Sequence, residues 1–225
     1  MDKVEFKDTG NEHLACALVL DTSSSMGFED RRVDGKLPIE RLNEALKRFK
    51  DNASKDPLTK SRVDILLIEF NDAAKIACNW KPICNMETPV FTAGGETNLN
   101  DALKLAVAEI RKECERYSDA EIGFYRPWLV LITDGEPQPA NIDEGVQAVK
   151  ERVDLERLKV IPIGVGNYDK TVLGKLSKDV IELGNYSFNE FFTWLHESMK
   201  IIAASRPDDK VQSAEIKGNM KVIDL

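Results

Sequence analysis

One carboxylate and a run of hydroxyl side chains follow directly after the first apolar segment of the sequence. Residues 18–27 are LVLDTSSSMG, in which three aliphatic residues precede an aspartate, four hydroxyl side chains and a glycine. Asp21, Ser23 and Ser25 are spaced two residues apart, and in a locally extended turn alternate side chains point to the same side. One carboxylate and two hydroxyls can then converge on a single cation, while Gly27 lets the backbone turn away. The spacing therefore favours a cation site over a solvated turn.

Two further loops offer the same kind of donor. Residues 92–100 (TAGGETNLN) lead into a helical pattern, and residues 133–137 (TDGEP) follow an apolar run. Each loop supplies oxygen atoms and a glycine, and neither supplies a thiolate or an imidazole. Such hard donors suit Mg²⁺, Mn²⁺ or Ca²⁺ and suit Zn²⁺ poorly. If the three loops meet, they form a site for a hard divalent cation.

The segments that must position these loops alternate between strand and helix patterns. Short apolar runs predict six strands, at residues 13–20, 62–70, 74–80, 128–133, 158–166 and 179–183. Apolar positions at helical spacing predict helices at residues 38–49, 99–114, 142–153 and 188–202, with a short helix after Asp169. This order predicts an α/β fold with a doubly wound, mostly parallel six-stranded sheet and helices on both faces.

The predicted topology also places the loops. Only three residues separate segments 62–70 and 74–80, which favours a hairpin and hence one antiparallel edge strand. In a sheet of this kind, ligands bind beyond the carboxyl ends of the strands, where the strand order reverses. All three oxygen-rich loops are expected at that end of the sheet.

Composition narrows the classes of partner. The chain has 225 residues and a formal net charge of −8, which argues against a nucleic acid or an anionic membrane as partner. The sequence contains no run of about 18 apolar residues, so no membrane span is expected. The first ten residues, MDKVEFKDTG, lack the apolar core of a signal peptide. These features predict a cytoplasmic location.

Cysteines and histidines are too dispersed for a second metal site. The four cysteines, at positions 16, 78, 84 and 114, form no CxxC pair and are expected to be reduced thiols. The two histidines, His13 and His196, lie far apart and are expected at a strand end and on a helix surface. We expect one domain at residues 13–205 with tails at 1–12 and 206–225. The second tail is charge-balanced without strong periodicity, so we place it outside the core.

The loop residues resemble those of a known family. The D-x-S-x-S pattern of Asp21, Ser23 and Ser25 resembles that of the von Willebrand factor A domain, whose metal site is called the metal-ion-dependent adhesion site (MIDAS). Thr97, in GGETNL, resembles the lone threonine of that family's second loop. Asp134, in LITDGEP, resembles its third-loop aspartate. The resemblance implies a Rossmann-like fold in which these five residues form one metal site.

The likeness extends beyond the site. It covers about residues 13–203 in element order and includes the antiparallel edge hairpin. The segments DTSSSM, GGETNLNDAL, YRPWLVLITDGEP and FFTWLHESM look like those of the stand-alone bacterial tellurite-resistance proteins of the TerY type. That narrower likeness implies a role in bacterial chemical stress. One departure is Ser24, which stands where many A domains have glycine.

The resemblance also implies roles. Ser23 and Ser25 would touch the ion directly and Thr97 directly or through water, while Asp21 and Asp134 would often act through water or by holding the hydroxyls. Neutral hydroxyl donors leave most of the ion's charge uncancelled, so the site should recruit an Asp or Glu from a protein partner. The expected ion is Mg²⁺ or Mn²⁺, with Ca²⁺ as a third candidate. We also expect basic residues on the partner, to match an acidic rim.

Other interpretations predict different chemistry. A magnesium-dependent phosphatase of the haloacid-dehalogenase kind also begins with an aspartate after its first strand, but it needs a second carboxylate two residues on, where this chain has Ser23. A serine hydrolase would need a G-x-S-x-G turn and an activating histidine. A third possibility is a metal that only braces the loops. The loop DTSSS alone is also compatible with a helix N-cap or an Asx turn. The three loops together favour a protein-binding module that is not an enzyme.

Overall fold

A single seven-stranded sheet forms the centre of the protein. The computed structural model describes residues 12–135, 142–205 and 212–224. The strands lie in the order β3-β2-β1-β4-β5-β6-β7. Their bounds are β1 Leu14–Asp21, β2 Val63–Phe70, β3 Ala74–Pro82, β4 Trp128–Thr133, β5 Lys159–Val165, β6 Asp179–Leu183 and β7 Met220–Asp224. Strands β2, β1, β4, β5 and β6 run parallel, and β3 and β7 pair antiparallel at the two edges.

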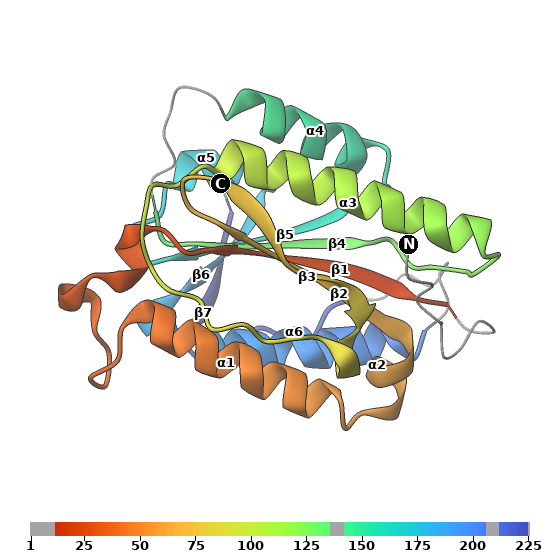
Figure 1. Cartoon of the computed structure of the whole chain (residues 1–225), viewed down its shortest axis with the longest axis horizontal. Coiled ribbons are helices and arrows are strands. Elements are labelled where there is room, and N and C mark those ends of the chain that lie inside the picture. Colours follow the sequence, from red (N-terminus) through yellow and green to blue (C-terminus); the bar gives the residue numbers. More distant parts are fainter. Residues whose placement is uncertain (1–11, 136–141, 206–211, 225) are drawn as a thin grey trace.

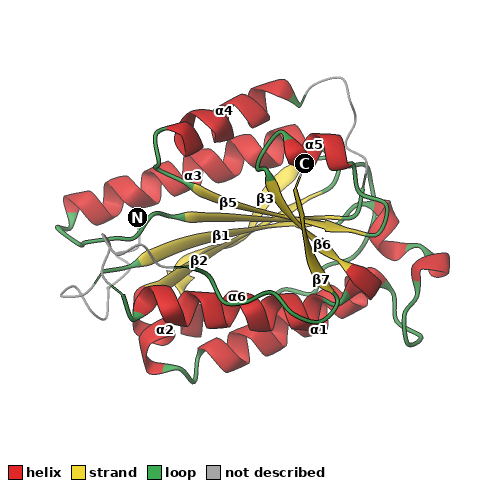
Figure 2. Cartoon of the chain, turned by 180° about the vertical axis from the view of Figure 1, so that it is seen from behind, coloured by secondary structure: helices red, strands yellow, loops and turns green. Residues whose placement is uncertain are grey.

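Helices cover both faces of this sheet, as Figures 1 and 2 show from opposite sides. One face carries α1 (Pro38–Ala53), α2 (Pro57–Arg62) and α6 (Phe188–Ala203), and the other carries α3 (Leu99–Asp119), α4 (Asp143–Asp154) and α5 (Lys170–Gly174). The predicted doubly wound α/β architecture is therefore confirmed, and so is the antiparallel edge formed by β3.

The central strands are apolar throughout because both of their faces are buried. Along β1, Leu14, Cys16, Leu18 and Leu20 belong to the core beneath α1 and α6. The alternate residues Ala15, Ala17 and Val19 belong to the core beneath α3 and α4. This double burial fixes the strand register, since a shift by one residue would exchange the two sets of side chains. It thereby fixes where β1 ends, at Asp21.

The number of strands is a correction to the sequence prediction. We expected six strands and a C-terminal tail outside the core, but Met220–Asp224 pair with β6 as a seventh strand. Met220 is buried, whereas Lys221 and Val222 are exposed. An edge strand is held mainly by backbone hydrogen bonds and buries few side chains, so its five residues give a weak apolar signal.

The segment that leads to β7 is bound to α6. Residues 212–219, called the C-terminal segment below, are hydrogen-bonded to three residues of α6. Trp194 Nε1 donates to the Ala214 carbonyl at 2.8 Å, and the Ala214 N–H donates to Ser198 Oγ at 3.0 Å. The Asn219 N–H donates to Glu190 Oε2 at 2.7 Å. These bonds join the last helix to the last strand of the sheet.

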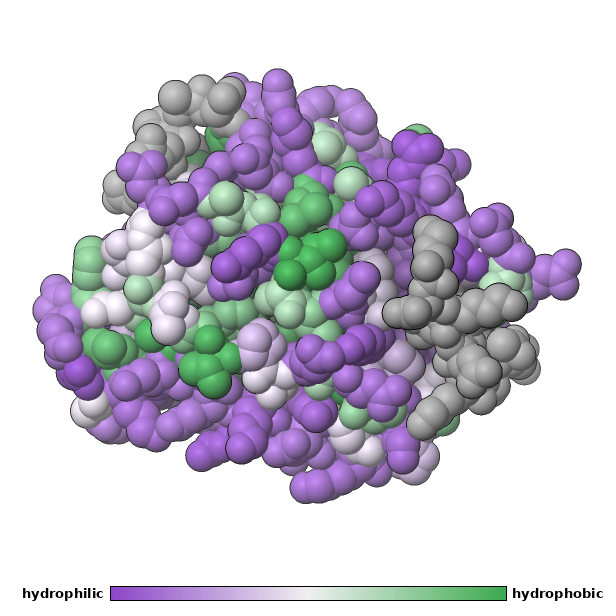
Figure 3. All heavy atoms as spheres, viewed as in Figure 1, coloured by the Kyte–Doolittle hydropathy of each residue, from purple (hydrophilic) through white to green (hydrophobic). Residues whose placement is uncertain are grey.

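The surface agrees with the acidic, polar composition. Figure 3 shows mostly hydrophilic residues, with hydrophobic ones gathered near the middle of the viewed face. Within the residues that the structure describes, no helix is both long and apolar enough to cross a membrane. All four cysteines are free, with Cys16 and Cys78 buried.

Candidate metal centre

The centre begins at the last residue of β1. Asp21 is fully buried, between the carboxyl ends of β2 and β4. The Ser23 N–H donates to its Oδ1 at 2.8 Å, and Thr133 Oγ1 donates to its Oδ2 at 2.5 Å. The carboxylate is thus held both by its own loop and by the end of the neighbouring parallel strand.

The two serines lie on a tight turn. Ser23 keeps an extended backbone, and Ser24–Gly27 then form one turn of 3-10 helix instead of the extended turn that we expected. The hydroxyls converge nonetheless, because Ser23 Oγ and Ser25 Oγ lie 3.0 Å apart. Ser25 Oγ also donates to Asp134 Oδ1 at 2.5 Å. The turn therefore links the first loop to a carboxylate 109 residues further along the chain.

Ser24 joins the first loop to the second. Its N–H donates to the Gly95 carbonyl at 3.0 Å, and its hydroxyl donates to the same oxygen at 2.9 Å. The Gly94 N–H in turn donates to the Thr22 carbonyl at 2.9 Å. The side chain at the position where glycine is common in A domains thus makes an additional cross-loop bond and leaves the loop in place.

Thr97 completes the group from the second loop. A Cβ atom added at Gly135 would lie 2.9 Å from Thr97 Oγ1 and 3.6 Å from Asp21 Oδ2. The third loop can therefore pass this close only because residue 135 has no side chain. Thr97 itself is 8% exposed. The structure thus brings all five residues that we selected from the sequence to one end of the sheet.

Burial disfavours the ionised forms of the two carboxylates. Burial raises the pKa of Asp21 to about 6, although hydrogen bonds from Ser23 and Thr133 favour the charged form. Burial also raises the pKa of Asp134 above its usual range, against the opposing effects of Ser25 and Arg31. Both shifts mean that ionised carboxylates are costly here unless a cation joins them.

Arg31 is a site residue that the sequence analysis missed. Its Nη1 donates to Asp134 Oδ2 at 2.6 Å, and its guanidinium lies 5.1 Å from the centre of the Phe28 ring. The neighbouring Arg32 instead pairs with Glu29. No spacing rule distinguishes two consecutive arginines in a loop, because the loop geometry alone decides which one turns inward.

A cavity opens above the hydroxyls. It has a volume of about 300 Å³ and is lined by Ser23, Ser24, Ser25, Arg31, Gly95, Thr97, Asp134, Gly135 and Asn167. A larger cavity of about 720 Å³ shares Arg31 and Asn167 with it. The charged residues of the larger cavity are Asp30, Arg31, Arg32, Lys170 and Glu182. The charges in the larger cavity are therefore mixed, and the acidic rim that we expected does not extend into it.

The donor set fits a hard divalent cation. Hydroxyl and carboxylate oxygens converge at the base of the cavity, and buried negative charge faces it. In the described ranges, no three or more His, Cys, Asp or Glu residues are grouped as metal ligands, so the centre depends on its hydroxyls. The two histidines lie elsewhere: His13 is buried next to Asp64, and His196 lies on α6.

Comparisons with known proteins agree with the family resemblance of the loop residues. The family model for the von Willebrand factor type A domain matches residues 16–197. Comparison with curated proteins gives no match. Among solved structures, the chain resembles proximal thread matrix protein 1 from the mussel byssus with a zinc-occupied MIDAS motif, at 16% identity and a TM-score of 0.56. That alignment covers 84% of this chain and 48% of the mussel protein.

Two bacterial structures are also similar. A von Willebrand factor type A protein from Catenulispora acidiphila has 13% identity and a TM-score of 0.59, with 85% of this chain and 43% of that chain covered. The pilus adhesin SpaC from Lactobacillus rhamnosus GG has 12% identity and a TM-score of 0.67, with 86% and 31% covered. The chain spans less than half the length of each, and at these identities the likeness is one of fold. Because the family model spans most of the sequence, the chain belongs to the von Willebrand factor type A domain family.

Proposed function

We propose that this chain is a metal-dependent protein-binding module. Its Asp21, Ser23, Ser25, Thr97 and Asp134 would hold one divalent cation, and a protein partner would supply an Asp or Glu as a further ligand. The observation that carries the proposal is the Ser25 hydroxyl, which lies 3.0 Å from Ser23 Oγ and 2.5 Å from Asp134 Oδ1 at the base of an open cavity. The zinc-occupied motif of the mussel protein supports a metal at this kind of site.

Each residue would have a distinct role. Ser23 and Ser25 would be direct ligands, Thr97 a direct or water-mediated ligand, and the two aspartates would orient the hydroxyls and balance charge. Mg²⁺ or Mn²⁺ suits these donors, with Ca²⁺ as a third candidate. When bound, the ion supplies an exchangeable position with strong positive charge, which attracts a carboxylate.

We further propose that the site is not catalytic. The cavity lining contains no histidine or lysine among the described residues, so no such side chain lies beside the hydroxyls as a base. Ser23 occupies the position at which a magnesium-dependent phosphatase needs its second carboxylate. A phosphatase-like hydrolase remains the alternative function, and hydrolysis of a phosphate ester by the wild type with Mg²⁺, lost in Asp21→Asn, would establish it.

The wider setting rests on the sequence motifs alone. Their likeness to the TerY type leads us to propose a cytoplasmic role in a bacterial stress or tellurite-resistance system, without nucleic acid or membrane as partner. A gene deletion tested for growth on tellurite, with complementation by wild type and Ser23→Ala, examines this part separately. Complementation by wild type alone would support it.

The binding function has a direct test. The immobilised protein is exposed to native lysate with Mg²⁺ or with EDTA, and captured proteins are identified by mass spectrometry. We expect a partner that is retained with Mg²⁺, lost with EDTA and lost with Ser23→Ala. Ser118→Ala is the matched control, because this exposed hydroxyl on α3 donates to the Cys114 carbonyl of its own helix. A partner captured equally under all conditions would contradict the proposal.

A further inference from the structure

The carboxylate of Asp134 already has a cation beside it. Arg31 Nη1 lies 2.6 Å from Asp134 Oδ2, and the Asp134 side chain has no exposed surface. Asp134 Oδ1 accepts the Ser25 hydroxyl at 2.5 Å. Both oxygens of this carboxylate are therefore engaged by the chain itself. A charge-assisted bond to a buried carboxylate is among the stronger polar contacts in a protein.

The guanidinium contacts Asp134, the Tyr186 phenol and the Phe28 ring, and it remains partly exposed. Arg31 ends the short 3-10 helix Glu29–Arg31, and its side chain is 19% exposed. The aromatic ring beneath it belongs to Phe28, which is itself 46% exposed. A long side chain in such a place can leave its partner without repacking the core.

A second place for the guanidinium lies next to the first. Arg31 lines both the 300 Å³ cavity above the hydroxyls and the 720 Å³ cavity beside it. The larger cavity contains the acidic residues Asp30 and Glu182. Arg32 and Lys170 also line this cavity, and Lys170 pairs with Glu182 at 3.1 Å, so Asp30 is the carboxylate there that a displaced Arg31 could approach.

We propose that Arg31 is an internal competitor of the divalent cation for Asp134, and so determines the cation concentration at which the centre fills. This inference rests on the proposed metal-binding function and extends it. The guanidinium compensates Asp134 in the absence of metal, and an incoming cation must weaken or displace that contact. Removing the competing charge then raises the affinity of the site for metal.

The test is a Mn²⁺ titration of the whole chain, in which the electron paramagnetic resonance signal of free Mn²⁺ gives the bound fraction. Arg31→Met keeps most of the side-chain length and removes the charge. We expect it to bind Mn²⁺ about tenfold more tightly than wild type, which corresponds to one competing contact. Arg31→Lys keeps a positive charge and is expected within about threefold of wild type.

Arg32→Met is the matched control, because this neighbouring arginine pairs with Glu29, whereas Arg31 pairs with Asp134. It should leave the Mn²⁺ affinity within about twofold of wild type. Arg31→Gln provides a second neutral variant, and circular dichroism establishes that each variant is folded. If wild type binds Mn²⁺ and neither neutral Arg31 variant binds more tightly, the competition is overturned while the metal site stands. If neither wild type nor any folded variant binds Mn²⁺, the proposed function itself fails.

Discussion

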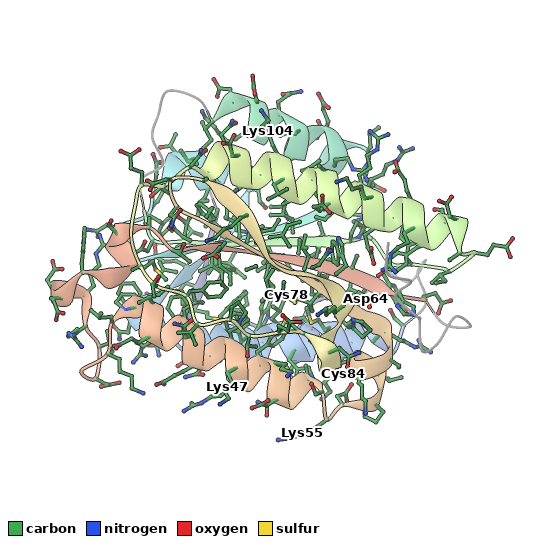
Figure 4. The ribbon with its side chains drawn as sticks, viewed as in Figure 1. Lys47, Lys55, Asp64, Cys78, Cys84 and Lys104 are labelled. Atoms are coloured by element: carbon green, nitrogen blue, oxygen red, sulfur yellow. The ribbon has the colours of Figure 1, made fainter. Side chains whose placement is uncertain are left out.

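Each end of the sheet contains a buried carboxylate, and the groups that surround the carboxylate differ between the two ends. At the carboxyl end of β1, Asp21 accepts hydrogen bonds from Ser23 and Thr133, and the neighbouring Ser25 and Asp134 line an open cavity. At the amino end of β2, Asp64 lies at the opposite side of the molecule (Figure 4). Tyr117 donates to Asp64 Oδ2 at 2.5 Å, and His13 Nδ1 lies 2.8 Å from the same oxygen.

The two ends differ in the solvent exposure of the residues around the carboxylate. His13, Asp64 and Tyr117 are each at most 2% exposed, so the chain supplies their partners and excludes solvent. Burial and the nearby Asp64 charge raise the pKa of Tyr117 well above its usual range, which keeps its hydroxyl a donor. Ser25, in contrast, is partly exposed to a cavity. All three carboxylates are buried, so the two ends differ in their hydroxyls: the Tyr117 hydroxyl is sealed, whereas the Ser25 hydroxyl faces a cavity that a ligand can enter.

The largest effect is expected at the sealed end. Asp64→Ala removes the acceptor shared by Tyr117 and His13 and leaves their polar atoms buried. Loss of one member of such a network should lower the free energy of unfolding by about 3 kcal/mol. Urea denaturation of wild type and variant measures this. The Mn²⁺ affinity of the folded variant should stay unchanged, and a change of tenfold would break the separation between the two ends.

The next effect belongs to the open end. Asp21→Ala and Asp134→Ala should each weaken Mn²⁺ binding by about 100-fold, since they remove charge and the orientation of the hydroxyls. Each should cost less unfolding free energy in EDTA than Asp64→Ala does, because burial already disfavours the ionised carboxylates. Identical metal titrations for wild type and both variants would refute the assignment of these residues.

Chelation should have a smaller effect than either set of substitutions. At free metal ten times the dissociation constant, binding adds about 1.4 kcal/mol to stability. For a chain of this size, EDTA should lower the melting temperature by about 4 °C. The far-UV circular dichroism at room temperature should not change, because the sheet and its helices carry the core. Loss of helix signal on chelation would show that the metal is a folding requirement.

The smallest effect sharpens the comparison within the sealed network. Tyr117→Phe removes one hydroxyl donor and leaves His13 beside Asp64. The expected loss is about 1 kcal/mol of unfolding free energy, the usual value of one hydrogen bond. Urea denaturation of Tyr117→Phe and Asp64→Ala compares the losses of unfolding free energy in the two variants. A loss as large as that of Asp64→Ala would mean that the tyrosine hydroxyl alone holds this end together.

Much of this arrangement could be predicted from the sequence, because buried parallel strands leave a continuous apolar signal. Asp21 and Asp134 each follow such a run closely, and parallel strands deliver their carboxyl ends to one edge of a sheet. Thr97 has no apolar strand before it, and its place came from the family motif instead. The positions of Asp21, Asp134 and Thr97 could be predicted because they depend on sheet topology or on a motif, and both leave a pattern in the sequence.

The features that were missed depend on backbone paths that leave no pattern. β7 is held at an edge with little burial, so its residues resemble those of an ordinary loop. Arg31 points to Asp134 only because of the 3-10 turns that precede it. The Ser24 bond to Gly95 likewise requires two loops to meet at a given distance. Each of these is set by tertiary geometry and not by residue type.

The C-terminal segment restrains the last helix, α6. Its bonds from Ala214 and Asn219 to Trp194, Ser198 and Glu190 cross from α6 to the strand that closes the sheet. With the second bond from Asn219 to Glu190, four hydrogen bonds must break before α6 can move relative to this segment, at a cost of about 4 kcal/mol. The segment that leads to the edge strand β7 thus anchors α6 to the sheet.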